Sequence, residues 1–204
     1  VLEIPEDARA EFDYKPGQFL TVAVPSEETG TVARCYSLSS APHETDLLTV
    51  TVKRTPDGYG SGWIHDHLRA GDTLRVLPPS GIFTPRDLDA DLLLLAGGSG
   101  ITPVMSMLRS LQRRTHRGRI TFLHYAQSPE HQIFAAELEE VRRSGYGVDV
   151  HLLHPELGDP ALSPAYLERL VPGYRDLPTW ACGPAPLINA VQAAYDGSDA
   201  LRIE

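Results

Sequence analysis

The chain has 204 residues and a formal net charge of −9 at pH 7, with 42% hydrophobic and 22% charged residues. This composition is typical of globular domains, and the acidic balance without a clustered basic stretch argues against nucleic acid as the main ligand. No apolar run approaches the ~20 residues that a membrane-spanning helix needs, so we expect no membrane span.

Cys35 and Cys182 are the only cysteines in the sequence. Two thiols are too few for a disulfide scaffold or a four-thiolate cluster, and no signal-peptide pattern precedes the first strand. We therefore expect a cytoplasmic protein. The alternation already under way at Val1 and the strand pattern starting at LRIE (201–204) lead us to expect a chain cut from a longer one.

Short alternating segments from Phe19 to Leu77 predict the strands of an antiparallel barrel. They are FLTVAV (19–24), VARCYSL (32–38), LLTVTVKR (47–54) and TLRVL (73–77). Between the last two, GSGWIHDHLRAGD (60–72) predicts a short helix closed by Gly71. Turn formers and charges dominate residues 79–91, where we place the boundary between a first domain, 1–88, and a second domain, 89–204.

From Asp91 onward, continuous apolar runs alternate with helical patterns, which predicts a parallel sheet covered on both faces. Strands are expected at 91–96, 119–126, 148–154, 179–183 and from 201, with helices at 103–114, 131–143, 163–171 and 186–195. The predicted fold class is therefore an antiparallel β-barrel followed by an α/β domain with a five-stranded parallel sheet.

The segment AGGSGITP (96–103) follows the first buried strand and opens a helix, which is the context in which a glycine loop binds phosphate. We expect Thr102 to cap this helix, and Gly98 and Gly100 to let the backbone approach a ligand closely. Pro103 stands where the dinucleotide fingerprint has its third glycine, which disfavours a standard Rossmann dehydrogenase. The alternative is a tight strand-to-helix turn without a ligand.

The end of the second parallel strand favours NADH over NADPH. The 2′-phosphate of NADPH needs a nearby Arg or Lys, and the sequence from 125 to 140 contains neither. Gln127 and Ser128 can hydrogen-bond a 2′-hydroxyl, whereas Glu130 would repel a phosphate. NADPH stays possible because Arg142 could fold over the site.

The segment ACGP (181–184) ends the fourth predicted strand and begins a helix. It places Cys182 at the carboxyl edge of the sheet, where ligands of open α/β sheets bind. The thiol either contacts a nicotinamide or fills space as a small hydrophobe, and both interpretations stay open.

The segment RCYS (34–37) puts a guanidinium, a phenol ring and a hydroxyl on one strand, and alternation places Arg34 and Tyr36 on the same face. A strand carrying R-x-Y-S before a dinucleotide-binding domain resembles the ferredoxin–NADP reductase superfamily. Four further segments resemble motifs of that superfamily in order along the whole chain: YKPGQF (14–19), GYGSGWIHDHL (58–68), GGSGITP (97–103) and CGPAPLINAV (182–191).

The resemblance implies FAD in a cleft between the two domains, with a nicotinamide nucleotide entering from the second. It implies Arg34, Ser61 and Gly62 on the pyrophosphate, Tyr36 against the isoalloxazine, and Ser37 hydrogen-bonded to flavin N5. Ser37 and Cys182 are the expected catalytic residues, as positioning groups, because hydride transfer itself needs no side-chain acid or base. The other cofactor-binding residues that we expect are Val52, Lys53, Arg54, Gly60, Trp63, Gly98, Gly100, Thr102, Tyr125, Gln127, Cys182, Gly183 and Pro184.

Within the superfamily, PSEETGTVARCYSLSSAP (25–42) and VLPPSGIFTP (76–85) resemble the reductase component of 3-ketosteroid 9α-hydroxylase and related oxygenase or desaturase reductases. Those proteins carry FAD and a [2Fe–2S] domain. The sequence has no C-x₄-C-x₂-C run, so the implied [2Fe–2S] ferredoxin is either a removed domain or a separate protein.

The implied function is electron transfer from NADH through FAD to that ferredoxin, which serves a downstream oxygenase or desaturase. We expect a monomer. Two alternatives remain, the reductase half of a flavohaemoglobin-type protein and a nucleotide-binding module without turnover.

Two histidine pairs, His65/His67 and His151/His154, invite a metal-site interpretation. Their spacing points the members of each pair to different sides of a helix or strand, so we expect them to be structural and expect no metal site.

Overall fold

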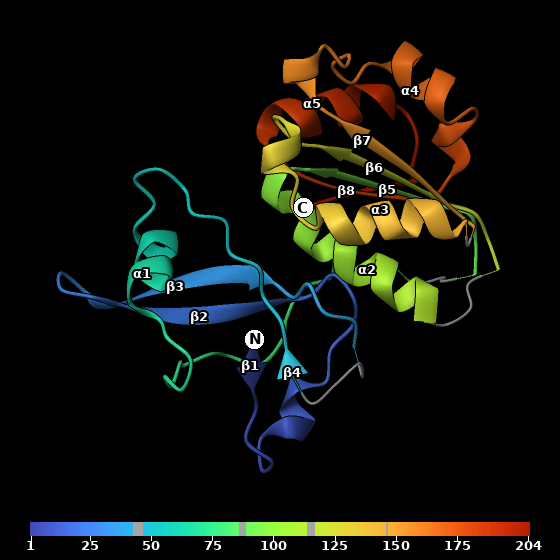
Figure 1. The fold of residues 1–204 in the computed structure, drawn as a ribbon. Coiled ribbons are helices and arrows are strands. Elements are labelled where there is room, and N and C mark those ends of the chain that lie inside the picture. The colour runs from blue at the N-terminus through green and yellow to red at the C-terminus, as the bar shows by residue number, and fades with distance from the viewer. Residues whose placement is uncertain (43–46, 86–88, 114–116, 146) are drawn as a thin grey trace.

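The computed structural model describes residues 1–42, 47–85, 89–113, 117–145 and 147–204. A half built from short antiparallel strands and one helix lies beside an α/β half (Figure 1). The fold class predicted from sequence is confirmed, because antiparallel strands precede a five-stranded parallel sheet. The predicted domain boundary after residue 88 adjoins residues 86–88, which lie outside the described residues.

The first half is organised around a hairpin of β2 (Phe19–Ser26) and β3 (Gly30–Ser37), and β1 (Leu2–Glu3) pairs with β4 (Leu47–Leu48). A 3-10 turn covers Arg9–Phe12. The inward side chains of the hairpin and its neighbours form a small core that contains Ile4, Leu20, Leu38 and Leu48. Burial of this alternating face explains why the sequence pattern predicted strands here.

Two predicted barrel strands are shorter or less regular than expected. Of LLTVTVKR only Leu47–Leu48 is a strand, and Val50 forms a single bridge to Leu38. The rest of the segment pairs with no strand, and its residues Thr51 and Lys53 line a cleft. In TLRVL, Val76 forms an isolated bridge to Val22. Pro78 and Pro79 follow this segment and lack the amide hydrogens that would extend the ladder.

The helix of the first half, α1 (Tyr59–His67), ends earlier than predicted. Leu68 is already extended at ψ 127°, so the helix does not reach Gly71. Gly71, at φ +95°, lies instead in the next turn, where the Arg69 amide donates to the Asp72 carboxylate at 2.7 Å. The prediction that Gly71 closes the helix was wrong, because a separate turn between the helix and the next segment uses this glycine.

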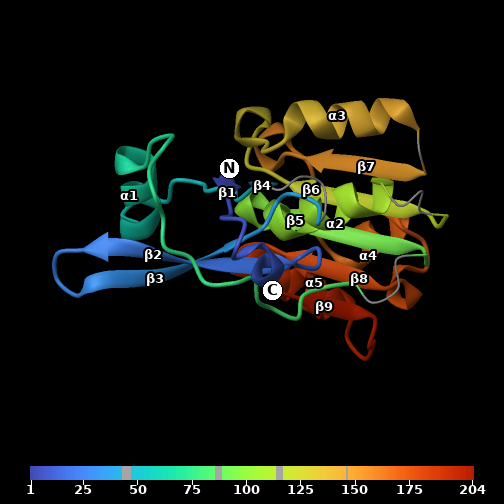
Figure 2. The same cartoon turned by 90° about the horizontal axis from the view of Figure 1, so that it is seen from below.

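The second half is a parallel sheet of order β7-β6-β5-β8-β9 covered by helices on both faces (Figures 1 and 2). The strands are β5 (Leu92–Gly97), β6 (Ile120–Tyr125), β7 (Val148–Leu153), β8 (Thr179–Cys182) and β9 (Leu201–Ile203). The helices are α2 (Ile101–Arg113), α3 (Ala135–Ser144), α4 (Pro164–Leu170) and α5 (Ala185–Ala194). Further 3-10 turns cover Gly98–Gly100, Pro129–His131, Pro155–Leu157 and Tyr174–Asp176.

The unbroken leucine run of β5 is explained by burial on both sides of the sheet. Leu92 and Leu94 join the core formed with α2 and α3, whereas Leu93 and Leu95 join the core formed with α4 and α5. A central strand of a parallel sheet therefore loses the alternation seen in the first half. Among the described residues, no helix combines the length and apolarity needed to cross a membrane.

Polar contacts join the two halves next to the RCYS segment. The Ser106 hydroxyl on α2 donates to the Ser40 carbonyl at 2.6 Å, and the Arg109 guanidinium donates to the Ser39 carbonyl. Arg109 also forms a two-pronged ion pair with Glu137 on α3, with N–O distances of 2.7 and 2.5 Å. Since α2 begins at the glycine loop, these bonds set the position of that loop relative to β3.

Candidate functional site

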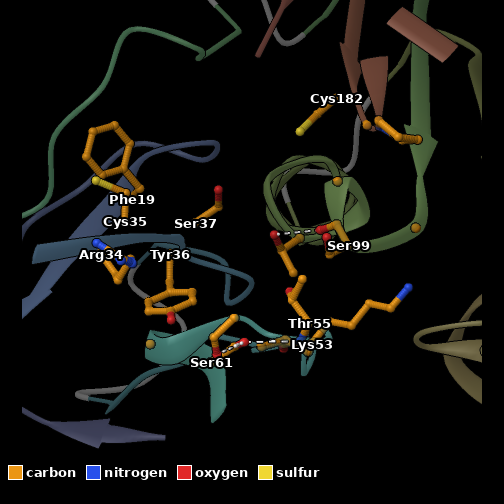
Figure 3. A pocket seen from close by; sticks show the side chains of 18 of the residues that line it. Phe19, Arg34, Cys35, Tyr36, Ser37, Lys53, Thr55, Ser61, Ser99 and Cys182 are labelled. Carbon is orange, nitrogen blue, oxygen red and sulfur yellow. Dashed lines mark hydrogen bonds between the residues drawn. The ribbon is translucent and has the colours of Figure 1, made fainter. Parts of the chain in front are cut away.

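A cleft of about 980 Å³ lies between the two halves (Figure 3). Four segments that are distant in sequence form most of its lining: the end of β3, the stretch from Thr51 into α1, the glycine loop after β5, and the end of β8 with the loop that follows; single residues at the start of β2 and after β9 complete it. The lining residues are Phe19, Arg34, Cys35, Tyr36, Ser37, Thr51, Lys53, Thr55, Asp57, Gly58, Tyr59, Gly60, Ser61, Gly97, Gly98, Ser99, Gly100, Thr102, Cys182, Gly183, Pro184 and Glu204.

All four residues of RCYS line the cleft, but they point in two directions. Arg34 and Tyr36 point together toward the start of α1, whereas Cys35 and Ser37 point to the other side (Figure 3). The alternation of a strand produces this split. Burial raises the pKa of the Tyr36 phenol, and nearby Arg34 offsets part of that rise, so the ring is uncharged at neutral pH.

The first turn of α1 packs against Arg34. A Cβ atom on Gly60 would lie 2.8 Å from the Cγ atom of Arg34, so a larger residue here would require the Arg34 side chain to move. The Ser61 hydroxyl accepts from the Thr55 amide at 3.0 Å and donates to the Gly58 carbonyl at 3.2 Å, which ties the approach segment to the helix.

Several residues predicted around this turn do not line the cleft. The Gly62 amide donates to Gly58 at 2.9 Å within the helix, and Trp63 stacks on His67 with ring centroids 5.5 Å apart. The Val52 carbonyl lies 2.8 Å from His65 Nε2, and Arg54 is ion-paired with Asp66 at 2.6 Å. Their expected contacts with a cofactor stay predictions.

Replacing Gly60 and Gly62 separately by Ala will distinguish the two glycines. We expect Gly60→Ala to displace Arg34 and to weaken roughly tenfold the binding of the FAD that the resemblance implies, because loss of one well-placed charged contact costs about 1.5 kcal/mol. The Cβ atom added in Gly62→Ala has no atom within 4 Å, so this change should leave FAD binding unchanged and stabilise α1 slightly. Titration of the apoprotein with FAD, followed by fluorescence, measures both; equal affinities would contradict this assignment.

The glycine loop is shaped by the chain segment that packs on it. Gly98 has φ +53°, a left-handed conformation that favours glycine. A Cβ atom on Gly100 would lie 2.3 Å from the carbonyl oxygen of Cys182. Gly100 is therefore required by the close approach of the loop after β8, which also lines the cleft.

Thr102 lines the cleft but does not cap α2. The helix begins at Ile101, two residues before the predicted start and directly after the 3-10 turn Gly98–Gly100, and the Thr102 hydroxyl donates back to the Ser99 carbonyl at 3.1 Å. The capping prediction was wrong because the 3-10 turn, and not a capping side chain, leads into the helix.

Cys182 lies at the carboxyl edge of the sheet, as its position at the end of a strand predicted, and lines the cleft. Burial raises the pKa of its thiol to about 12, and Glu204 contributes to the rise. The thiol is therefore neutral at physiological pH and unsuited to be a nucleophile or base. Glu204 also lines the cleft, and burial raises the pKa of its carboxyl group.

Tyr125 and Gln127, expected near the adenosine half of the dinucleotide, do not line the described cleft. The Tyr125 hydroxyl donates to the Pro160 carbonyl at 3.4 Å, and the Gln127 amide donates to the Glu156 carboxylate at 2.6 Å. They lie at and just beyond the end of β6, and their role in binding stays a prediction.

Sequence reasoning assigned no role to several lining residues, among them Phe19, Thr55, Tyr59, Ser99 and Glu204. Phe19 ends PGQF, Tyr59 lies within GYGSG and Ser99 lies within GGSG, so treating each motif as a whole segment would have found them. Glu204 carries no comparable signal, because it reaches the cleft through the pairing of β9 with β8.

The four histidines considered as metal ligands make other contacts, and no group of three or more metal-binding side chains occurs in the part of the chain that the structure describes. His151 lies 3.0 Å from the Asp149 carboxylate, and His154 lies 3.1 Å from the Gln132 side chain.

Models of two protein families match the chain, an oxidoreductase FAD-binding domain over residues 2–84 and an oxidoreductase NAD-binding domain over residues 94–193. A relative in Rhodococcus rhodochrous, the ferredoxin reductase component of 3-ketosteroid-9-alpha-monooxygenase, is 44% identical over 199 residues, which are 96% of this chain and 56% of the relative. The chain thus spans about half the length of this relative.

Solved structures show the same similarity. Phthalate dioxygenase reductase, described as a modular structure for electron transfer from pyridine nucleotides to [2Fe–2S], is 31% identical with a TM-score of 0.73, covering 94% of this chain and 58% of that one. The flavohaem-like FAD/NAD-binding domain of nitric oxide dioxygenase from Vibrio cholerae O1 biovar El Tor has a TM-score of 0.80 at 24% identity, covering 94% and 85%. At that identity, it shows the fold alone.

Proposed function

Because the chain belongs to the ferredoxin reductase-like family of FAD- and NAD-binding oxidoreductases, we propose that it passes electrons from NADH through FAD to a [2Fe–2S] ferredoxin domain or protein. The observation that carries the proposal is that RCYS and the glycine loop line one cleft, although they belong to different halves of the chain. A flavin and a nicotinamide can react only if two such sites face each other.

The chemistry of the cleft fits FAD. Among the described residues, the Arg34 guanidinium has no carboxylate within ion-pair distance, so it can bind a pyrophosphate together with the first turn of α1. The half-buried ring of Tyr36 offers a flat apolar surface for the isoalloxazine, and the Ser37 hydroxyl offers a hydrogen bond to N5. Bound FAD would supply the chemistry, by accepting a hydride from the reduced nicotinamide and releasing electrons singly.

The second half of the cleft fits a nicotinamide dinucleotide. The 13-residue helix α2 directs its amide end toward the cleft through the turn Gly98–Gly100, which favours an anionic group there. Neutral Cys182 and the backbone of Gly183 present a compact surface beside that turn. We propose that these residues orient the nicotinamide, exclude water and take no part in proton transfer.

We propose NADH as the preferred donor. Supporting this, the polar side chains beyond β6 are already paired with carboxylates. Gln127 donates to Glu156 at 2.6 Å, and the Ser128 hydroxyl donates to Glu130 at 2.5 Å. A 2′-phosphate in this region would be repelled by both carboxylates, whereas a 2′-hydroxyl could bind them.

The wider assignments also belong to this proposal. We propose an oxygenase or desaturase system as the destination of the electrons, and the name of the Rhodococcus relative, a monooxygenase component, supports the oxygenase. We propose a monomer, and we propose a cytoplasmic location, for which the unpaired thiols of Cys35 and Cys182 are the supporting observation. The flavohaemoglobin-type alternative has the fold similarity to the Vibrio cholerae domain in its favour, but that similarity does not identify an acceptor.

The test is a visible spectrum of the FAD-supplemented protein, followed by stopped-flow mixing with NADH or NADPH at equal concentration. We expect bound yellow FAD that NADH bleaches faster than NADPH does, and transfer of electrons onward to an added [2Fe–2S] ferredoxin. A protein that stays colourless would support the alternative of a nucleotide-binding module without turnover. Faster bleaching by NADPH would contradict the choice of donor, and bleaching without transfer to ferredoxin would contradict the acceptor.

A further inference from the structure

A fully buried histidine lies beneath the glycine loop. His124 on β6 is 0% exposed and pairs in register with Ala96 of β5, one residue before Gly97. It shares a strand face with Ile120 and Phe122, which belong to the core against α2 and α3. An imidazole in such a position costs free energy unless both ring nitrogens are hydrogen-bonded, so its partners are informative.

Both ring nitrogens of His124 have partners, and these partners determine the tautomer. Nε2 lies 3.1 Å from the Gly98 carbonyl oxygen, which can only accept, so Nε2 carries the hydrogen. Nδ1 accepts from the side-chain amide of Gln132. The Gln132 oxygen in turn lies 3.1 Å from His154 Nε2, which fixes the amide orientation. Burial lowers the pKa of His124 to about 4, so this neutral form persists at physiological pH.

The bond to Gly98 controls the part of the loop that faces the cleft. Gly98 adopts φ +53°, and its carbonyl oxygen also accepts from the Ile101 amide at the start of α2. In a trans peptide unit, the carbonyl and the following N–H point in opposite directions. Holding the Gly98 carbonyl against His124 therefore directs the Ser99 amide away from the core, and Ser99 lines the cleft.

We propose that His124 is a positioning residue for the nicotinamide dinucleotide: it holds the Gly98 peptide so that the Ser99 amide binds a phosphate of the dinucleotide. Gln132 and His154 support it by keeping the hydrogen on the correct nitrogen. This inference rests on the proposed use of a nicotinamide dinucleotide, and it deepens that proposal by naming what orients the phosphate-binding amide.

The experiment compares His124→Leu with His124→Gln in the FAD-loaded chain. Leu fills the space without a donor, whereas the Gln amide nitrogen can replace Nε2. Calorimetric titration with NAD⁺ gives the affinity, and steady-state assays with NADH and ferricyanide give KM and kcat. We expect His124→Leu to raise Kd and KM about tenfold with kcat nearly unchanged, and His124→Gln to restore most of the loss.

A matched control comes from β8, where the buried Thr179 hydroxyl donates to the Leu177 carbonyl at 2.9 Å and lies 2.6 Å from the Tyr195 hydroxyl. Thr179→Val should lower stability without changing Kd or KM. Unchanged affinity in His124→Leu, or equal weakening in His124→Gln, would overturn the proposal, because either result leaves no role for the donated hydrogen bond.

If His124→Leu fails to fold, Gln132→Leu provides a second test. It removes the donor to Nδ1 and should raise Kd for NAD⁺ by a smaller factor, and an unchanged Kd would overturn the proposal. Failure of the proposed function has a different signature. A wild-type chain that binds NAD⁺ but is not bleached by NADH contradicts electron transfer, while the comparison of affinities still decides the role of His124.

Discussion

Arg34→Ala will yield a protein that purifies without FAD and rebinds it weakly. The guanidinium lies in the cleft beside Tyr36 and the first turn of α1, and a planar donor of this kind binds a pyrophosphate through two parallel hydrogen bonds. Loss of that interaction should cost about 3 kcal/mol, which is roughly 150-fold in the dissociation constant. Fluorescence titration with FAD measures the change.

Two further variants sharpen this result. Arg34→Lys should have an intermediate affinity, because an ammonium group keeps the charge without the paired geometry. Arg143→Ala serves as the control, since Arg143 is exposed, paired with Glu140 at 3.0 Å and outside the cleft. Wild-type affinity in Arg34→Ala, or equal losses in the Arg34 and Arg143 variants, would show that RCYS does not bind the pyrophosphate.

Gly100→Ala should abolish efficient use of NADH while leaving FAD bound. The added Cβ would lie 2.3 Å from the Cys182 carbonyl oxygen and 2.6 Å from the Gly183 amide nitrogen, which are backbone atoms that no side-chain rotation can move. The two loops must separate, and a displacement of about 1 Å at such a site costs roughly 100-fold in hydride transfer. Overpacking of this kind should also lower the unfolding free energy by about 1–3 kcal/mol.

Stopped-flow bleaching of FAD by NADH measures the rate of hydride transfer, and urea unfolding measures the unfolding free energy. The control is Gly158→Ala, at φ +93° with no atom within 4 Å of the added Cβ. That change strains the backbone at a position that does not line the cleft. The unfolding free energy should therefore fall, while the rate of bleaching stays at the wild-type value. Normal bleaching in Gly100→Ala would mean that the packing of the two loops does not position the nicotinamide.

Patterns that depend on neighbours in sequence predicted most of the fold. Burial on both faces requires a run such as LLLL in β5, and burial on one face requires alternation such as that of β2, so the two halves could be told apart. The alternation within RCYS likewise predicted that Arg34 and Tyr36 share a direction, which Figure 3 shows. Boundaries were less predictable, as the ends of α1 and the start of α2 illustrate.

The sequence by itself determined most of the strands and helices, and it predicted which motifs carry phosphate-binding and flavin-binding chemistry, because backbone conformation and burial pattern depend on residues a few positions apart. Only the tertiary structure decided why Gly100 must be glycine, why Gly60 leaves room for Arg34, and how His124, Gln132 and His154 join beneath Gly98. Those features depend on distances between atoms of segments far apart in the chain, and such distances exist only after the two halves and their loops have packed.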